Sequence, residues 1–367
     1  MKILVEREKL LAPVSLVAGV VERRQTLPIL AYLLIRAADD KITMVGTDLE
    51  VEMVAVVEGR IREAGDITVP ARKLLDICRA LPEGAEIGLS QQSSKVVLKA
   101  GKSRFTLTSL LPTDFPKVEA ETFENSLRVS ASLLKRVLEA TSFCMALQDV
   151  RYYLNGVYVE LENRCLRTVA TDGHRMAVSE VGLEQDLSTP TNFIIPRKAV
   201  QEILRLLPND ETSMVTIMVG QNHLRLTVGG LTVTTKLIDG KFPDYRKVIP
   251  TAQTKLLVLE REIFREALNR AAILANEKYR GVRLNLESGR LSITAHNPDQ
   301  EEAVEELEVA YDGEPLEIGF NVNYLADATS AVQSPEIRLG LSDASSSCTL
   351  QSPNDASTEY IVMPMRL

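Results

Sequence analysis

The sequence has no tryptophan and little histidine or cysteine, which restricts the chemistry that it can support. Three histidines and four cysteines among 367 residues leave few ligands for a metal and few groups for histidine-based catalysis. The cysteines, at positions 78, 144, 165 and 348, are too scattered for a zinc motif or a disulfide framework, and this usage is typical of a reducing cytoplasm. No apolar run approaches the roughly 18 residues of a membrane span, and the N-terminal residues lack the apolar core of a secretory signal. We therefore expect a cytoplasmic protein without a metal, a cofactor or a membrane partner.

The chain instead repeats one pattern about every 125 residues. A polar turn at Asp48 returns at Asp172 and again at Asn297, so that successive copies lie 124 and 125 residues apart. Each copy also closes on a proline that follows Phe or Met. A period of this length is too long for a solenoid repeat, so each copy should be a domain with its own core. We expect three domains, at residues 1–125, 126–250 and 251–367.

Within each repeat the hydrophobic pattern follows the same order. A short strand precedes a helix, on which Leu10, Val14 and Val17 show helical spacing in the first copy. Alternating segments then predict strands, and a proline marks the start of a second helix, at residues 72–81 and 197–207 in the first two copies. The predicted order is β-α-β-β-β-α-β-β-β. The fold class is therefore α+β, with an antiparallel sheet and two helices in each of three repeated domains.

Basic residues recur on the predicted helices although the chain is acidic overall. The net charge is −8, and by repeat it is −1, +2 and −9. Cations on neighbouring helices predict a face that binds phosphate, and Arg, Gln and Tyr in the loops after the first helices suit phosphate contact and stacking. A solvated helix face, or a core position for the tyrosines, explains any single residue about equally well. The predicted DNA-binding residues are Arg24, Arg72, Arg79, Arg136, Gln148, Tyr152, Tyr153, Arg197, Lys198 and Arg205.

Recognisable catalytic motifs are absent from the sequence. The best candidate is Asp172 with His174, an acid that could orient a histidine in a hydrolase. The matching turns at Asp48 and Asn297 lack a histidine, which favours a structural turn. Asp48, Glu50 and Glu52 alternate along a strand and could bind a divalent ion, but a solvated strand face explains them equally well. We therefore expect no catalytic and no metal-binding residues.

The whole sequence resembles the bacterial sliding clamps, the beta subunits of DNA polymerase III. The most specific stretches are residues 148–156, 168–175, 241–246, 271–278 and 363–367. The resemblance implies the DNA clamp fold, with two chains closed head to tail into a ring around duplex DNA. Such a ring acts as a processivity factor without bond chemistry. The implied partners are a second copy of the chain, duplex DNA in a non-sequence-specific way, the DNA polymerase III alpha subunit, the clamp loader, and other polymerases and repair proteins that carry short peptide motifs.

The resemblance also assigns a partner-peptide pocket between the second and third repeats. Methionines beside proline and valine would give it an adaptable apolar surface. Its residues are Leu154, Thr171, Gly173, His174, Arg175, Met176, Pro243, Val248, Val362, Met363, Pro364, Met365 and Arg366. One departure from the family pattern lies at residues 345–348, Ser-Ser-Ser-Cys, where the pocket edge is more polar than usual.

A dimer interface between the first repeat of one chain and the third repeat of the other follows from the same resemblance. Phe105 and Leu107 would pack against Ile273 and Leu274. The basic side chains Lys73, Lys102 and Arg104 would face the acidic side chains Asp299, Glu301, Glu302 and Glu305. The acidic excess of the third repeat agrees with this arrangement, and complementary charge would set the register of the two chains.

Two alternatives to a replicative clamp remain at this point. One is a clamp paralogue with a specialised repair or resistance role, which would form the same ring with other partners. The other is a monomeric hydrolase that uses Asp172 and His174. Two further departures bear on DNA contact: Gln25 replaces a common proline, and residues 321–332 contain no basic side chain.

Overall fold

The computed structural model describes residues 1–21, 27–116, 121–123, 125–185 and 190–366. Each repeat begins with a strand and a helix, continues through four strands to a second helix, and ends with three strands. The first repeat contains one additional short strand, β5 (Arg60–Glu63). None of the helices in the described ranges is long and apolar enough to cross a membrane.

The predicted order of elements lacks one strand in the second and third repeats and two in the first, where β5 is the additional one. The strand missed in every repeat directly precedes the second helix, where the prediction had only a proline that starts the helix. Pro70 and Pro196 are instead the last residues of strands. Proline is acceptable there because both strands lie at the edge of a sheet, where one side of the strand needs no hydrogen-bond donors. The strands missed directly before the second helices are β6 (Gly65–Pro70), β14 (Thr191–Pro196) and β22 (Leu316–Asn321).

The first compact unit comprises residues 1–135 and 198–237 and contains two antiparallel sheets. The five-stranded sheet has the order β5-β1-β7-β8-β9, and the eight-stranded sheet has the order β10-β15-β16-β17-β4-β3-β2-β6. Pairing of Leu231 with Ala55 and of Thr235 with Val51 joins the second repeat to the first within the larger sheet. The remaining strands are β1 (Lys2–Glu6), β2 (Tyr32–Ala38), β3 (Lys41–Thr47), β4 (Val51–Val57), β7 (Glu86–Gln92), β8 (Lys95–Ala100), β9 (Ser103–Thr108), β10 (Asn125–Ser130), β15 (Met214–Val219), β16 (His223–Val228) and β17 (Leu231–Lys236).

The second compact unit comprises residues 136–197 and 238 onward and is built in the same way. Its eight-stranded sheet has the order β14-β11-β12-β13-β25-β24-β23-β18, and its four-stranded sheet has the order β21-β20-β19-β22. Pairing of Arg175 with Val362 joins the second repeat to the third. The remaining strands are β11 (Gly156–Glu162), β12 (Cys165–Thr171), β13 (Arg175–Gly182), β18 (Lys255–Glu260), β19 (Gly281–Glu287), β20 (Arg290–His296), β21 (Glu302–Glu308), β23 (Glu336–Leu341), β24 (Cys348–Ser352) and β25 (Asp355–Val362).

The central repeat is therefore divided between the two units, because each half contributes four strands to a neighbour's sheet. Main-chain hydrogen bonds thus run without interruption from one repeat into the next, and these junctions are parts of a sheet rather than flexible linkers. The domain boundaries after residues 125 and 250 stay predictions.

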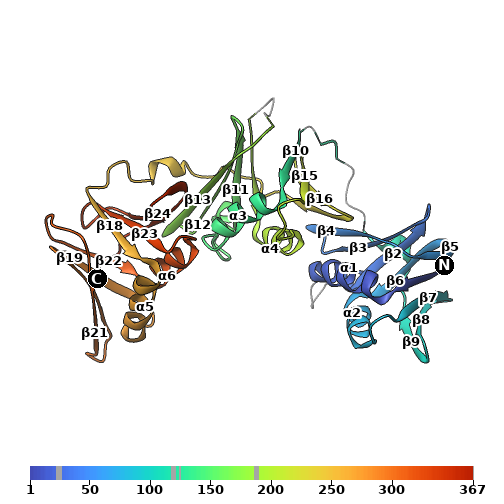
Figure 1. Ribbon diagram of the computed structural model, residues 1–367. Coiled ribbons are helices and arrows are strands. Elements are labelled where there is room, and N and C mark those ends of the chain that lie inside the picture. The colour runs from blue at the N-terminus through green and yellow to red at the C-terminus, as the bar shows by residue number, and fades with distance from the viewer. Residues whose placement is uncertain (22–26, 117–120, 124, 186–189, 367) are drawn as a thin grey trace. The chain divides into compact units, whose positions relative to one another are not determined.

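Each helix buries one apolar face against a sheet. In the first helix Leu10, Val14 and Val17 are fully buried, as their spacing predicts. In the first unit α1 packs on β3 and β4 and lies beside α2, and in the second unit α5 packs on β20 and β21 and lies beside α6 (Figure 1). The polar faces of the helices remain available for other contacts. The helices of the described residues are α1 (Arg7–Val20), α2 (Ala71–Ala80), α3 (Ala131–Ser142), α4 (Arg197–Leu206), α5 (Arg261–Ala271) and α6 (Val322–Ala331).

Short 3-10 turns connect several of these elements. They lie where the chain leaves a helix or approaches a strand, and two of them fall in stretches that the sequence analysis singled out. The turns are η1 (Pro28–Ala31), η2 (Pro112–Asp114), η3 (Tyr152–Leu154), η4 (Tyr245–Lys247) and η5 (Ala272–Leu274).

Candidate functional site

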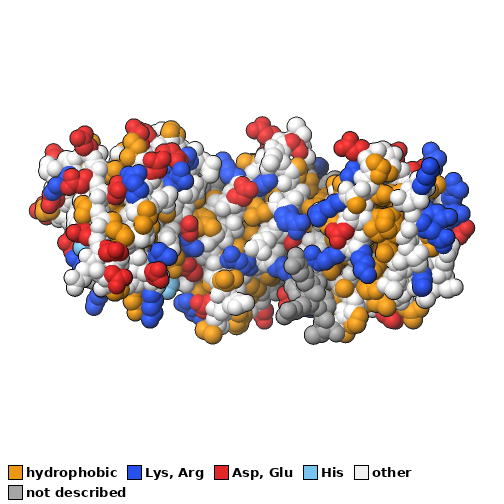
Figure 2. All heavy atoms as spheres, turned by 90° about the horizontal axis from the view of Figure 1, so that it is seen from below, with side chains coloured by type: hydrophobic (Ala, Val, Ile, Leu, Met, Phe, Trp, Pro, Cys, Tyr) orange, Lys and Arg blue, Asp and Glu red, His pale blue; other side chains and the backbone are white. Residues whose placement is uncertain are grey.

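The predicted DNA-binding cations on α2 and α3 are exposed at the surface. Arg72, Arg79 and Arg136 all have exposed side chains. Arg72 also donates a hydrogen bond of 3.3 Å to the carbonyl oxygen of Val21, which orients the guanidinium without neutralising its charge. Figure 2 shows Lys and Arg side chains gathered over the first compact unit.

The predicted cations on α4 are held by other groups of the protein. Arg197 donates to the carbonyl oxygen of Met145 at 3.1 Å. Lys198 forms an ion pair with Asp48, and Arg205 forms one with Glu202 at 2.9 Å. Two of these three cations, Lys198 and Arg205, therefore already face an anion, whereas Arg197 faces a neutral carbonyl oxygen.

The loop at residues 148–153 is held open by its own polar contacts. Asn155 accepts from the amide of Asp149 and donates to its carbonyl oxygen, at 3.0 and 2.9 Å. The Arg151 guanidinium lowers the pKa of Asp149 to about 2. Gln148, with a positive φ of 54°, is exposed at the start of this loop. The loop thus presents Gln148 outward together with the apolar Val150, which is 94% exposed.

The two tyrosines of this loop have different environments. The side chain of Tyr152 is 58% exposed, which suits a stacking contact, whereas Tyr153 packs partly against the core. Their rings meet edge to face at 5.9 Å. The core alternative therefore holds in part for Tyr153 and not for Tyr152. Arg24 lies outside the described residues.

The predicted peptide-pocket residues all lie in the second compact unit, and several of them meet. Leu154 and Met176 are buried in one cluster, on which Val248 packs. Val362 is buried opposite Arg175 on the neighbouring strand, and Met363 continues from it with a hydrogen bond of 2.9 Å to the carbonyl oxygen of His174.

The remaining pocket residues surround this apolar cluster. Thr171 is buried and its hydroxyl accepts from the amide of Gly173 at 3.0 Å. The amide of Met365 donates to Gly319 on β22 at 2.8 Å, which fixes the C-terminal segment. Pro243, His174 and Arg366 are exposed, and Pro364 is half-buried.

Arg175 ties the second repeat to the third. Its guanidinium pairs with Asp172 at 3.1 Å and with Asp327 on α6 at 2.6 Å. It also lies 4.6 Å from the ring centroid of Tyr324, in a cation–π contact. Asp172 takes part in this network and in the hydrogen bonds of its own turn. No hydrogen bond between described residues joins the Asp172 carboxylate to the ring of His174. His174 stacks near Tyr324 instead, at 6.4 Å.

The segment that carries Pro243 and Val248 is anchored by a residue that the sequence analysis missed. Glu160 on β11 accepts a hydrogen bond of 2.7 Å from the hydroxyl of Tyr245 and two from Arg246, at 3.1 and 2.8 Å. Arg167 adds a further bond at 3.2 Å. Burial alone would raise the pKa of Glu160, but the hydrogen bonds that it accepts outweigh burial and lower it. No local sequence signal pairs residues 160 and 245, because only the fold brings them together.

The polar edge at residues 345–348 is also ordered by its own contacts. The hydroxyls of Ser345 and Ser346 each donate to Asp343 at 2.7 Å. Cys348 is fully buried at the start of β24. The serine hydroxyls are thus engaged within their turn.

The predicted dimer residues divide into exposed and buried ones. In the first repeat Lys73, Lys102 and Arg104 are exposed and make no ion pair with another described residue. Phe105 is half-buried, whereas Leu107 is only 7% exposed and belongs largely to the core of its own repeat. The exposed charged residues of the predicted interface in the first repeat are therefore all basic.

The corresponding surface of the third repeat is acidic and partly apolar. Ile273 is 76% exposed and Leu274 is half-buried, both in η5, which packs beside β21. Every residue of β21 remains at least partly accessible. Glu305 on this strand accepts two hydrogen bonds from Arg270, at 2.9 and 2.7 Å, and this contact lowers its pKa. Asp299, Glu301 and Glu302 are exposed.

Neither the described acidic residues nor the cysteines assemble a metal centre. The described part of the chain holds no group of three His, Cys, Asp or Glu side chains placed to bind an ion. Asp48, the first member of the proposed divalent site, faces Lys198 instead. Cys78, Cys144 and Cys348 are buried like small apolar residues, whereas Cys165 is partly exposed.

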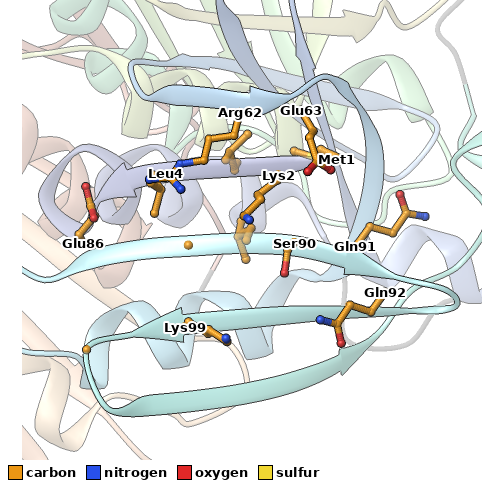
Figure 3. Close-up of a pocket in the computed structure, with 14 residues that line it drawn as sticks. Met1, Lys2, Leu4, Arg62, Glu63, Glu86, Ser90, Gln91, Gln92 and Lys99 are labelled. Atoms are coloured by element: carbon orange, nitrogen blue, oxygen red, sulfur yellow. The ribbon is translucent and has the colours of Figure 1, made fainter.

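A groove of about 510 Å³ lies on the five-stranded sheet, between β5, β1, β7 and β8 (Figure 3). Its lining mixes Lys2, Arg62 and Lys99 with Glu63 and Glu86, so it favours neither an anion nor a cation strongly. None of the predicted site residues lines it.

Three α+β repeats joined through continuous sheets, with basic side chains on exposed helix faces, are the features of a DNA clamp. Family models match the chain in three consecutive parts: the N-terminal domain of the DNA polymerase III beta subunit at residues 1–119, the central domain at 128–244 and the C-terminal domain at 246–366. The chain belongs to this family, the beta sliding clamps, which are non-enzymatic processivity factors of DNA polymerase III. The hydrolase alternative is therefore wrong.

Similar proteins cover the whole chain. The beta sliding clamp of Pseudomonas putida is 50% identical over 368 residues, which cover 99% of each chain, and that of Escherichia coli K12 is 46% identical over the full length of both. Among solved structures, the DNA polymerase III subunit beta of Pseudomonas aeruginosa is 48% identical, covers 100% of both chains and has a TM-score of 0.97. The pol III beta of Caulobacter crescentus is 39% identical, with full coverage and a TM-score of 0.94.

Proposed function

We propose that two copies of this chain close head to tail into a ring that encircles duplex DNA without reading its sequence. The first repeat of one copy would meet the third repeat of the other, with β9 facing β21. The observation that carries this proposal is Ile273, an isoleucine that is 76% exposed beside a strand with no fully buried residue. Apolar surface and a strand edge left open in one chain are what a second copy would cover.

Charge supports the same pairing. Arg104 lies on β9 and Lys102 directly precedes it, and Glu302 lies on β21 and Glu301 directly precedes it. Complementary charges would steer the two copies into register more than they would add affinity. Glu305 contributes less to this attraction than the resemblance implied, because Arg270 already neutralises it within the chain.

Inside the ring α2, α3 and α4 would face duplex DNA, where their cations would contact phosphates, and Gln148 and Tyr152 would contact the backbone or bases. Phosphate contacts carry no sequence information, which suits a protein that slides. The residues around Leu154 and Met176 would bind short peptide motifs of the DNA polymerase III alpha subunit, the clamp loader, other polymerases and repair proteins. We place this activity in the bacterial cytoplasm.

The solution mass tests the ring. Light scattering over a dilution series from micromolar to nanomolar should give a mass near twice 40.6 kDa that persists on dilution. I273A/L274A should raise the dimer dissociation constant at least tenfold, because each aliphatic side chain lost from a seam costs a few kcal/mol.

The matched control is L256A/V258A, which also removes two aliphatic side chains of the third repeat; Leu256 and Val258 are 53% and 52% exposed but lie on β18, away from the proposed seam. This control should dimerise like the wild type. A wild-type chain that stays monomeric throughout, or a control that dissociates as readily as the seam variant, would contradict the proposal.

A further inference from the structure

Two of the predicted DNA-binding cations on α4 already lie against carboxylates of the protein. Lys198 pairs with Asp48, which lies in the turn between β3 and β4 of the first repeat. Arg205 donates to both carboxylate oxygens of Glu202, at 3.1 and 2.9 Å. A phosphate that approaches α4 therefore meets cations that have an internal partner.

The carboxylates in these pairs are hidden, whereas the cations are reachable. The Asp48 and Glu202 side chains are 6% and 9% exposed, and those of Lys198 and Arg205 are 28% and 47% exposed. Burial raises the pKa of Glu202, and Arg205 opposes that shift. The buried carboxylates thus pair with the cations on the protein side, and the outer sides of the cations remain accessible to a ligand.

The other cations of this surface differ in their partners. Arg72 and Arg197 are held by carbonyl oxygens, which orient a guanidinium and leave its charge intact. A carboxylate partner instead supplies a full opposite charge and competes with phosphate. An ion pair near the protein surface is also screened less than one between fully exposed charges.

We propose that Asp48 and Glu202 weaken the hold of α4 on DNA by competing with phosphate for Lys198 and Arg205. This inference rests on the proposed function, in which α4 faces duplex DNA. The two acidic residues are positioning residues, because they touch the cations and not the DNA. When the duplex moves, each cation can return to its internal carboxylate, so that contacts with successive phosphates remain short-lived. A ring that slides needs such exchange, since tight phosphate contacts would stop it.

Asp48→Asn removes the negative charge at this site and can keep the hydrogen bonds of the turn. The Oδ1 atom of Asp48 accepts the amides of Glu50 and Val51, at 2.9 and 2.7 Å, and an asparagine oxygen can keep both bonds. Asp210→Asn is the matched control, because Asp210 accepts the amides of Thr212 and Ser213 in a similar turn and pairs with no described cation. The control removes the same charge from the same compact unit.

The measurement is the equilibrium binding of a fluorescent linear duplex, followed by anisotropy over a series of salt concentrations. D48N should bind about 3 to 10 times more tightly at low salt, and the slope of log K against log salt should steepen by about one, because one more cation would neutralise a phosphate. E202Q should act in the same direction through Arg205. D210N should match the wild type, and K198Q introduced into D48N should abolish the gain.

The outcomes separate the inference from the function on which it rests. Wild-type binding that depends on salt but is unchanged in both D48N and E202Q would overturn the inference alone. An equal gain in D210N would also overturn it, because the effect would then be one of net charge. If neither the wild type nor any variant shows salt-dependent binding, the proposed contact with DNA fails as well. Thermal unfolding and solution mass show which variants are folded dimers.

Discussion

Residues of the same type have different environments in this chain, because the side chains that contact them differ. The cations of α2 and α4 look alike in sequence, yet Arg79 is exposed while Lys198 faces a carboxylate. Burial raises the pKa of the thiols of Cys78 and Cys348 to about 11 and about 12, so both are neutral at physiological pH. The role of a side chain is therefore decided by contacts from distant segments.

Gly156 gives a residue-scale prediction. A Cβ atom added there would lie 2.3 Å from the carbonyl oxygen of Ile195 on the paired strand, and a backbone atom cannot move aside cheaply. Gly156→Ala should lower the free energy of unfolding by about 2 kcal/mol or more. Denaturant unfolding followed by circular dichroism measures it.

Gly182 provides the control for this substitution. It lies at the end of β13 in the same repeat, and a Cβ there would meet nothing within 4 Å. Gly182→Ala should be neutral or slightly stabilising. Equal stability of the two variants would show that the space beside Gly156 is less tight than described.

At the scale of elements, the second helices of the first two repeats were predicted within one residue at each end, whereas at least one strand of each repeat was missed. The helices have a clear apolar period and flanking prolines, and these are local signals. The missed strand β14 ends on Pro196 directly before α4, so its short apolar run was absorbed into the start of the helix. The pairings between repeats, such as β17 with β4, depend on segments about 180 residues apart in sequence.

The residues of the candidate site could likewise be predicted from the sequence only in part. Sequence resemblance could name Pro243 and Val248, because they lie in or beside a distinctive stretch of sequence. It could not name Glu160, which is 85 residues from its partner Tyr245 and is joined to it only by the fold. Nor could it show that Leu107 is largely buried in its own repeat.

Glu160 gives the element-scale prediction. Glu160→Gln keeps the size of the side chain but removes the charge that holds Arg246, so the segment with Pro243 and Val248 should become less fixed. We expect several-fold weaker binding of a clamp-binding peptide from a partner polymerase, because the pocket would have to order that segment on binding. Isothermal titration calorimetry at neutral pH measures this affinity.

Glu162→Gln is the control, because Glu162 lies two residues further on the same strand and is exposed. It should leave the peptide affinity unchanged. Adding Tyr245→Phe to Glu160→Gln should cause little further loss if both side chains act through the same contact. Independent, additive losses would contradict this assignment.

At the scale of the whole molecule, three sequence repeats are combined into two compact units. Each unit is held by a sheet that continues from one repeat into the next, so the repeats cannot separate without breaking main-chain hydrogen bonds. This continuity within each unit suits the proposed ring, whose seams would lie between subunits. The acidic third repeat and the basic border of the first would provide complementary ends for such a seam.

The measurement that tests this account most directly is retention on DNA before and after linearisation. Labelled protein is loaded onto nicked circular duplex by a clamp loader with ATP, and the complex is isolated by gel filtration. The circle is then cut at one site. We predict that the protein elutes with the circular DNA and is lost once the DNA has ends, because it is held by topology. Equal retention on circular and linear DNA would show that the protein binds the duplex without encircling it, and would contradict the account.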